Sequence, residues 1–199
     1  EPVRMAGLFF GLVAGSVAAA LPRVKQWDSM RAVVLLLVGV AAFFLLGFRS
    51  SGVADPPLWA YFLAGAIAIC AMILPGISGS FILLMLGMYD LVLGAVNDRQ
   101  LATVAVFATG CAIGLMLFSQ VLHWALHHHH DTVVAGLIGL MLGSLRVLWP
   151  WPEGTAGTTM TMPQDDVVVP ILLAVTGFVV VAGFALVAFR VERAAERVA

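Results

Sequence analysis

Residues 75–80 read Pro-Gly-Ile-Ser-Gly-Ser and lie inside a long apolar stretch, residues 57–96. This order of residue types predicts a break in a helix, because proline removes a backbone donor and glycine adopts conformations that a helix does not use. Backbone groups freed by such a break cannot face lipid, so the break must be buried in protein or line a wet cavity. Such a break therefore indicates a ligand-binding site.

The residues around the break are suited to an anion. A helix is predicted to begin at Gly79 and to run through residues 81–96, and its first N–H groups have no partner within the helix. Ser78 and Ser80 add hydroxyl donors, while Gly76 lets a ligand approach the backbone closely, as Gly79 also does. These four residues are the predicted phosphate-binding set. A Pro-Gly kink capped by serine is the alternative.

The composition is that of a membrane protein. Of the 199 residues, 62% are hydrophobic and 11% are charged, against roughly 25% charged residues in an ordinary soluble domain. The net charge of -1 gives no sign of a nucleic-acid partner. Cys70 and Cys111 lie in apolar runs, so two small buried hydrophobes are preferred over a disulfide or a metal site, and no cofactor is predicted.

Apolar runs long enough to cross a bilayer predict an all-α, polytopic fold. We expect a single transmembrane domain over residues 1–199, with a broken-helix hairpin at 57–96 and about five spans, forming half or more of an inverted-repeat transporter. The predicted spans are residues 5–21, 31–48, 101–126, 132–149 and 167–189.

Basic residues predict the orientation. They gather in the first loop (Arg23, Lys25, Arg31) and near the C-terminus (Arg190, Arg193, Arg197), so both regions are expected to be cytoplasmic. The acidic connection 150–166 is then external. The predicted location is the cytoplasmic (inner) membrane, with several passes. The same count places residue 1 outside, and the odd number of spans predicts that an N-terminal half precedes this chain.

Two charged residues inside apolar segments are further candidates. Arg146 is the only Arg or Lys in the run 132–149, where an ionisable group is costly unless it is paired or functional, and its guanidinium suits a phosphate. The alternative is an arginine that extends to the interface beside Trp149 and Trp151. Asp90 could carry a coupling proton or pair with Arg146, and the alternative is a helix cap.

The histidines and the glycine ridges can be explained without a binding role. Residues 127–130 are four histidines that follow His123, but their spacing is not that of a tetrahedral metal site, so a solvated helix end is predicted. Glycines at positions 7, 11 and 15, and at 110 and 114, form ridges that predict close helix packing.

Residues 75–90 resemble the signature of the bacterial polyprenyl-phosphate transporter family, and residues 139–146 with 149–152 are similar to a second family segment. The resemblance implies a transporter that returns undecaprenyl phosphate from the outer to the inner leaflet, so that the lipid carrier of cell-envelope synthesis is recycled. Members usually contain two related halves, and this chain shows one Pro-Gly-x-Ser-Gly motif. Position 147 is Val, where a second basic residue is expected.

The resemblance implies polyprenyl phosphate and membrane lipids as partners, and a homo-oligomer stays open. An ion-coupled carrier of a small anionic solute is the alternative, because it would use the same helix break. An intramembrane enzyme is not expected, since Ser78 has no histidine or lysine predicted at its depth to act as a base.

Overall fold

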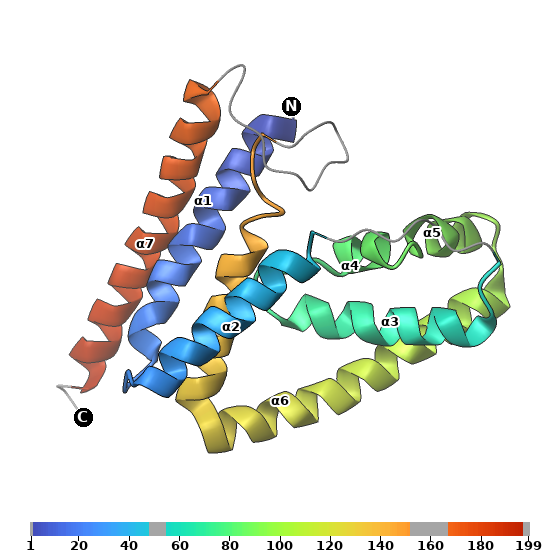
Figure 1. The fold of residues 1–199 in the computed structure, drawn as a ribbon, viewed down its shortest axis with the longest axis horizontal. Coiled ribbons are helices and arrows are strands. Elements are labelled where there is room, and N and C mark those ends of the chain that lie inside the picture. Colours follow the sequence, from blue (N-terminus) through green and yellow to red (C-terminus); the bar gives the residue numbers. More distant parts are fainter. Residues whose placement is uncertain (1, 48–54, 152–166, 197–199) are drawn as a thin grey trace. The chain divides into compact units, whose positions relative to one another are not determined.

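The computed structural model describes residues 2–47, 55–151 and 167–196 (Figure 1), and it is all-helical over this part of the chain, as predicted. Most of the predicted acidic loop, residues 152–166, lies outside the described residues, as does Arg197. The elements are α1 (Pro2–Ala20), the 3-10 turn η1 (Leu21–Arg23), α2 (Ser29–Leu45), α3 (Leu58–Ile73), α4 (Gly79–Met85), α5 (Tyr89–Asn97), α6 (Leu101–Ser144) and α7 (Val168–Glu196).

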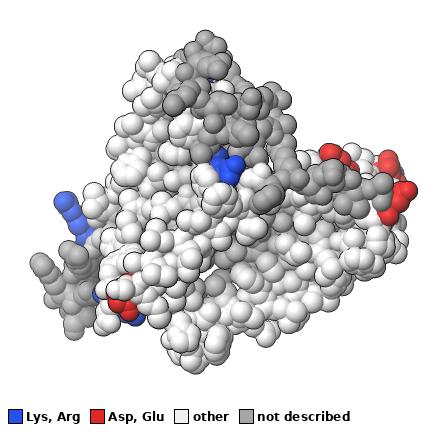
Figure 2. All heavy atoms as spheres, in the orientation of Figure 1, with Lys and Arg blue, Asp and Glu red and all other residues white. Residues whose placement is uncertain are grey.

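Three of the described helices are long and apolar enough to cross a membrane: Val3–Arg23, Leu101–Ser144 and Val168–Val191. The pair α4 and α5 adds a fourth if the two are one broken span, while α2 and α3 are shorter apolar helices. The five predicted spans are therefore matched in part. Most of the face visible in Figure 2 carries no charge, as expected of a membrane protein.

The chain divides into two compact units. Unit 1 comprises Glu1–Gly47 and Val134–Ala199, and unit 2 comprises Phe48–Val133, so that α6 contributes to both. The single domain expected over residues 1–199 stays a prediction.

Helices α1 and α7 of unit 1 pack side by side through glycines (Figure 1). Each glycine of the first ridge lies directly against the α7 backbone: Gly7 at Pro170, Gly11 at Ala174 and Gly15 at Phe178. Both series advance by four residues in the same direction, so the two helices are parallel. The predicted close packing of this ridge is confirmed.

A second glycine-mediated contact in unit 1 joins α2 to the C-terminal arm of α6. Gly139 lies against the carbonyl of Leu35, and Gly143 lies against the carbonyl of Gly39. A Cβ on Gly143 would lie 2.5 Å from that oxygen and 2.6 Å from Cβ of Ala42, so the position has no room for a side chain.

Unit 2 is built on a third parallel pair, α3 and the N-terminal part of α6. Gly110 lies against Phe62 and Gly114 against Ala66, which confirms the packing predicted for this ridge. The two cysteines are free and belong to the same contact: Cys70 Sγ donates to the Gly114 carbonyl at 3.6 Å, and Cys111 Sγ donates to the Gly65 carbonyl at 3.4 Å.

The prediction of one helix through residues 81–96 is wrong. Helix α4 ends at Met85, α5 begins at Tyr89, and the two are bent by 109°. Gly87 adopts a left-handed conformation with φ 68°, and the N–H of Met88 bonds the carbonyl of Leu83 at 2.9 Å, which is a Schellman termination. Leu83 and Met88 are buried together, so packing fixes the second break.

Replacing Gly87 with alanine is expected to destabilise the protein by about 1 kcal/mol, because a Cβ is strained in the left-handed region. The matched control is Gly94→Ala, since Gly94 lies inside α5 with nothing within 4 Å of an added Cβ, and this change is expected to stabilise by roughly 0.5 kcal/mol. Thermal unfolding in detergent, followed by circular dichroism, measures both. Equal midpoints for the two variants would contradict the proposed role of Gly87.

The range of α6, Leu101–Ser144, joins two helices across a kink, and the backbone is non-helical at His129, where φ is -135° and ψ is 43°. The kink lies among residues 127–131, where the sequence predicts the connection between the spans 101–126 and 132–149. The two predicted spans are therefore separate helical arms, joined by a kink instead of a longer loop. The helix ends at Ser144, and residues 145–148 form turns.

Candidate functional site

The predicted break at residues 75–80 lies in unit 2. Helix α3 ends at Ile73, and Leu74 is extended with ψ 129°, as expected for the residue before a proline. Gly76 follows with φ 88°, a conformation that favours glycine. The prediction that a helix from Leu58 ends at Pro75 is confirmed, and the chain turns here before α4 begins at Gly79.

The two serines place a pair of hydroxyls on the surface of unit 2. Ser78 Oγ and Ser80 Oγ are 2.7 Å apart, and both side chains are exposed, as are Pro75 and Gly76. Ser78 occupies the N-cap position of α4, yet its side chain makes no capping hydrogen bond. The serine-capped kink therefore does not account for Ser78, whose hydroxyl faces that of Ser80 instead.

Gly79 has a packing role. It is buried, and an added Cβ would lie 2.5 Å from Cγ of Met72 and 2.9 Å from the carbonyl oxygen of Ala68, both on α3. This contact lets α4 pack against α3 and is sufficient to explain the glycine. Helix α4 has seven residues, so its dipole is carried by two turns, and the hydroxyl pair becomes the most distinctive polar feature of the break.

Arg146 lies in unit 1, in the turn that follows α6, and is half-buried. Its Nη1 donates to the carbonyl of Phe43 at 2.9 Å, and Cζ lies 4.6 Å from the centroid of the Phe43 ring. The guanidinium also lies against Gly47, where a Cβ would be 2.6 Å from Cζ. Arg146 thus packs against the C-terminal end of α2.

This contact has an electrostatic reason. Phe43 is in the last turn of α2, whose carbonyls have no partner within the helix and form the negative end of its dipole. A guanidinium satisfies such a carbonyl and is stabilised there. The sequence suggests Arg146 as a phosphate ligand or as an arginine at the membrane interface, and it does not predict a contact with the end of α2. Phe43 and Arg146 are 103 residues apart, so no local spacing relates them.

Asp90 lies in the first turn of α5 and is exposed. An acidic residue is favoured at this position because the N-terminal end of a helix is positive. Asp90 belongs to unit 2 and Arg146 to unit 1. A coupling role for Asp90, and any pairing with Arg146, stay predictions.

The histidines lie on the exposed surface of α6 around its kink. His123 and His127 stack with ring centroids 6.2 Å apart, and His130 Nδ1 lies 3.0 Å from an oxygen of Asp131. Among the residues that the structure describes, no group of three or more His, Cys, Asp or Glu is arranged to hold a metal ion.

Comparisons with known proteins point to one family. Residues 1–165 match the family described as undecaprenyl phosphate translocase-like. A protein of Vibrio cholerae serotype O1, named polyprenyl-phosphate transporter, is 44% identical over 153 residues, which cover 77% of this chain and 49% of that protein. A Staphylococcus aureus protein of the same name is 27% identical over 159 residues, covering 71% of this chain and 56% of that protein.

The chain therefore spans about half the length of these two relatives. No solved structure matches it. The family match extends over both units and includes the helix break and Arg146. This chain belongs to the undecaprenyl phosphate translocase-like family.

Proposed function

We propose that this chain forms part of a transporter that returns polyprenyl phosphate to the inner leaflet of the bacterial cytoplasmic membrane. The family and the names of two relatives support this substrate. The observation that supports a phosphate site at the helix break is the exposed hydroxyl pair of Ser78 and Ser80. The Ser78 hydroxyl makes no capping hydrogen bond and lies against that of Ser80. A carrier of a small anionic solute is not favoured by any of these observations.

The residues proposed to bind phosphate are Gly76, Ser78, Gly79 and Ser80 at the helix break of unit 2 and, separately, Arg146 of unit 1. At the break, hydroxyl and backbone N–H donors replace water around the phosphate oxygens. Arg146 supplies a guanidinium, whose charge and planar fork suit a phosphate. The polyprenyl chain stays in the apolar phase while the headgroup crosses. No bond of the substrate is made or broken, so the activity needs no catalytic residue and no cofactor.

The proposed orientation places the first loop and the C-terminus in the cytoplasm. It is supported by unit 1, in which α1 and α7 are parallel and the α1–α2 connection lies at the same end as the C-terminus (Figure 1). Basic residues of both segments, Arg23, Lys25 and Arg190, are therefore at one end of the unit.

Inward movement of an anion opposes an inside-negative potential by about 2.3 kcal/mol per charge per 100 mV. Proton uptake would offset this cost. We assign Asp90 as the candidate carrier of a coupling proton, since it is an exposed carboxylate on the same broken hairpin as the serines.

The serines are tested by leaflet exchange of a fluorescent polyprenyl phosphate in proteoliposomes, with protein expressed from its complete gene. Changing Ser78 and Ser80 together to alanine is expected to lower the exchange rate about tenfold or more, because each hydrogen bond to a charged group is worth roughly 1.5–3 kcal/mol. Ser119→Ala is the matched control, since Ser119 is exposed on α6 and bonds only its own helix, through the Met116 carbonyl.

Exchange by the double variant at the rate of the control would remove the serines from the site. Protein-dependent uptake of inorganic phosphate without any lipid exchange would favour the small-anion carrier instead.

A further inference from the structure

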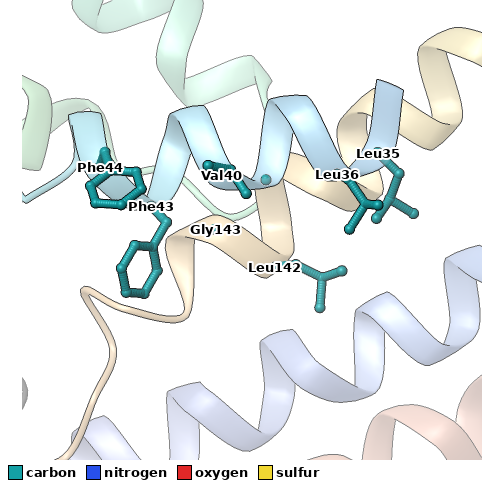
Figure 3. Close-up of a pocket in the computed structure, with 8 residues that line it drawn as sticks. Leu35, Leu36, Val40, Phe43, Phe44, Leu142 and Gly143 are labelled. Carbon is teal, nitrogen blue, oxygen red and sulfur yellow. The ribbon is translucent and has the colours of Figure 1, made fainter. Parts of the chain in front are cut away.

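Unit 1 contains an apolar groove between α2 and the C-terminal arm of α6. Its volume is about 230 Å³. Figure 3 shows Leu35 and Leu36 toward one end and Phe43 and Phe44 at the other, with Leu142 on the neighbouring arm of α6. The lining residues in the described part of the chain are all apolar or glycine.

Glycines shape the groove. Gly39 of α2 and Gly143 of α6 lie in its wall and bring the two backbones into direct contact, as described above. The missing side chains leave a trough, while large side chains flank it: Leu36, Val40 and Phe44 are each more than half exposed. The groove is therefore open along α2, and none of the residues of unit 1 that the structure describes fills it.

A positive group lies at one end of this groove. The Arg146 guanidinium is stacked over the ring of Phe43, a groove residue, and bonds the carbonyl of the same residue. Phe43 and Phe44 form an edge-to-face pair with centroids 5.6 Å apart, so this end of the groove is lined by aromatic rings. An apolar trough that ends at a guanidinium is complementary in shape and in charge to an apolar chain that ends in a phosphate.

We infer that this groove binds the isoprene units nearest the phosphate of a polyprenyl phosphate, while Arg146 contacts the phosphate itself. The inference rests on the proposed function and adds to it the position of the chain. Ordinary lipid tails are as apolar as the groove, so apolar contact alone would not select an occupant in a bilayer. Selection comes from the guanidinium at the Phe43 end, which favours a terminal phosphate, and from the aromatic pair beside it.

A matched pair of substitutions on α2 tests the groove. Leu36 lines it and is 62% exposed, whereas the next residue, Leu37, is 65% exposed and does not line it. Leu36→Trp places a ring in the path of the bound chain, and we expect a fall in polyprenyl phosphate exchange of about fivefold or more, as is common when a filled site is overpacked. Leu37→Trp is expected to exchange at the wild-type rate.

The second measurement is photo-crosslinking in the same proteoliposomes. The probe is a polyprenyl phosphate that carries a diazirine in the isoprene unit next to the phosphate, compared with a phospholipid that carries a diazirine in its acyl chain. Crosslinks of the polyprenyl probe are expected at residues 36–44, with Leu36→Trp reducing them and Leu37→Trp leaving them unchanged. The phospholipid probe is expected to label the exposed faces of α2 without this preference.

The outcomes separate the inference from the proposed function. Wild-type exchange with equal rates in the two tryptophan variants, or equal labelling of residues 36–44 by both probes, would overturn the groove assignment and leave the transporter proposal standing. A wild-type protein that gives no exchange above the protein-free rate would overturn the proposed function, and the groove assignment with it.

Discussion

Arg146→Ala is expected to lower polyprenyl phosphate exchange at least tenfold. The change removes the guanidinium that is proposed to contact the phosphate, and a hydrogen bond to a charged group is worth roughly 1.5–3 kcal/mol. The measurement is leaflet exchange in proteoliposomes with protein that is matched for membrane insertion. The interpretation depends on a second function of this side chain, because Arg146 also bonds the carbonyl of Phe43 at the end of α2.

Arg146→Lys separates the two functions. Lysine keeps a positive charge and can donate to the Phe43 carbonyl, but it lacks the planar fork that binds two phosphate oxygens at once. We expect the lysine variant to keep its thermal stability and to lose most of its exchange, while the alanine variant loses both. The expected stability loss for alanine is about 1 kcal/mol, from the helix-end interaction.

Two results would contradict this account. Exchange at the wild-type rate by both variants would remove Arg146 from the phosphate site and leave it as a cap of α2. Full exchange by the lysine variant alone would show that charge is required and that bidentate geometry is not.

The first helix break could be predicted from sequence because its causes are local. Proline 75 excludes a helical backbone at the preceding residue, and Leu74 is indeed extended. The second break, at Gly87, could not be predicted, because a single glycine is tolerated in a membrane helix. What ends α4 there is the burial of Leu83 against Met88, which is a tertiary contact.

The position of the connection within α6 could be predicted, but its form could not. Four histidines followed by Asp131 interrupt the apolar sequence, and the kink between the two helical arms lies among them, at His129. Residues 127–131 contain neither proline nor glycine, so the backbone on both sides of His129 can stay helical with the side chains in solvent, and all four histidines are exposed. Polarity therefore predicts where the two arms meet, and the structure shows that they meet at a kink instead of a loop.

The candidate site residues also divide into those with a local sequence signal and those whose surroundings depend on distant contacts. Ser78 and Ser80 lie within three residues of sequence, which predicts both as hydroxyl donors at the break, and their contact at 2.7 Å is a finding of the structure. The surroundings of Arg146 depend on α2 and were not predicted, since Phe43 and Gly47 carry no local signal that relates them to a residue a hundred positions later.

Gly11→Ala is expected to cause the largest loss of stability in unit 1, about 2 kcal/mol or more. The added Cβ would overlap the carbonyl oxygen of Ala174 and lie 2.6 Å from its carbonyl carbon, so the obstacle is backbone and cannot rotate away. Helices α1 and α7 would have to separate along the ridge, which removes close packing that membrane helices depend on.

Gly183→Ala is the matched control, because Gly183 lies in α7 with nothing within 4 Å of an added Cβ. It is expected to leave stability unchanged or to raise it by up to about 1 kcal/mol, through better helix propensity. Thermal unfolding in detergent compares the stability of the two variants. Leaflet exchange of polyprenyl phosphate shows whether the change in packing also impairs the function proposed for Arg146, which lies in the same unit. If Gly11→Ala unfolds at the temperature of Gly183→Ala, the two helices tolerate a wider spacing, and the glycine ridge is not what holds α1 against α7.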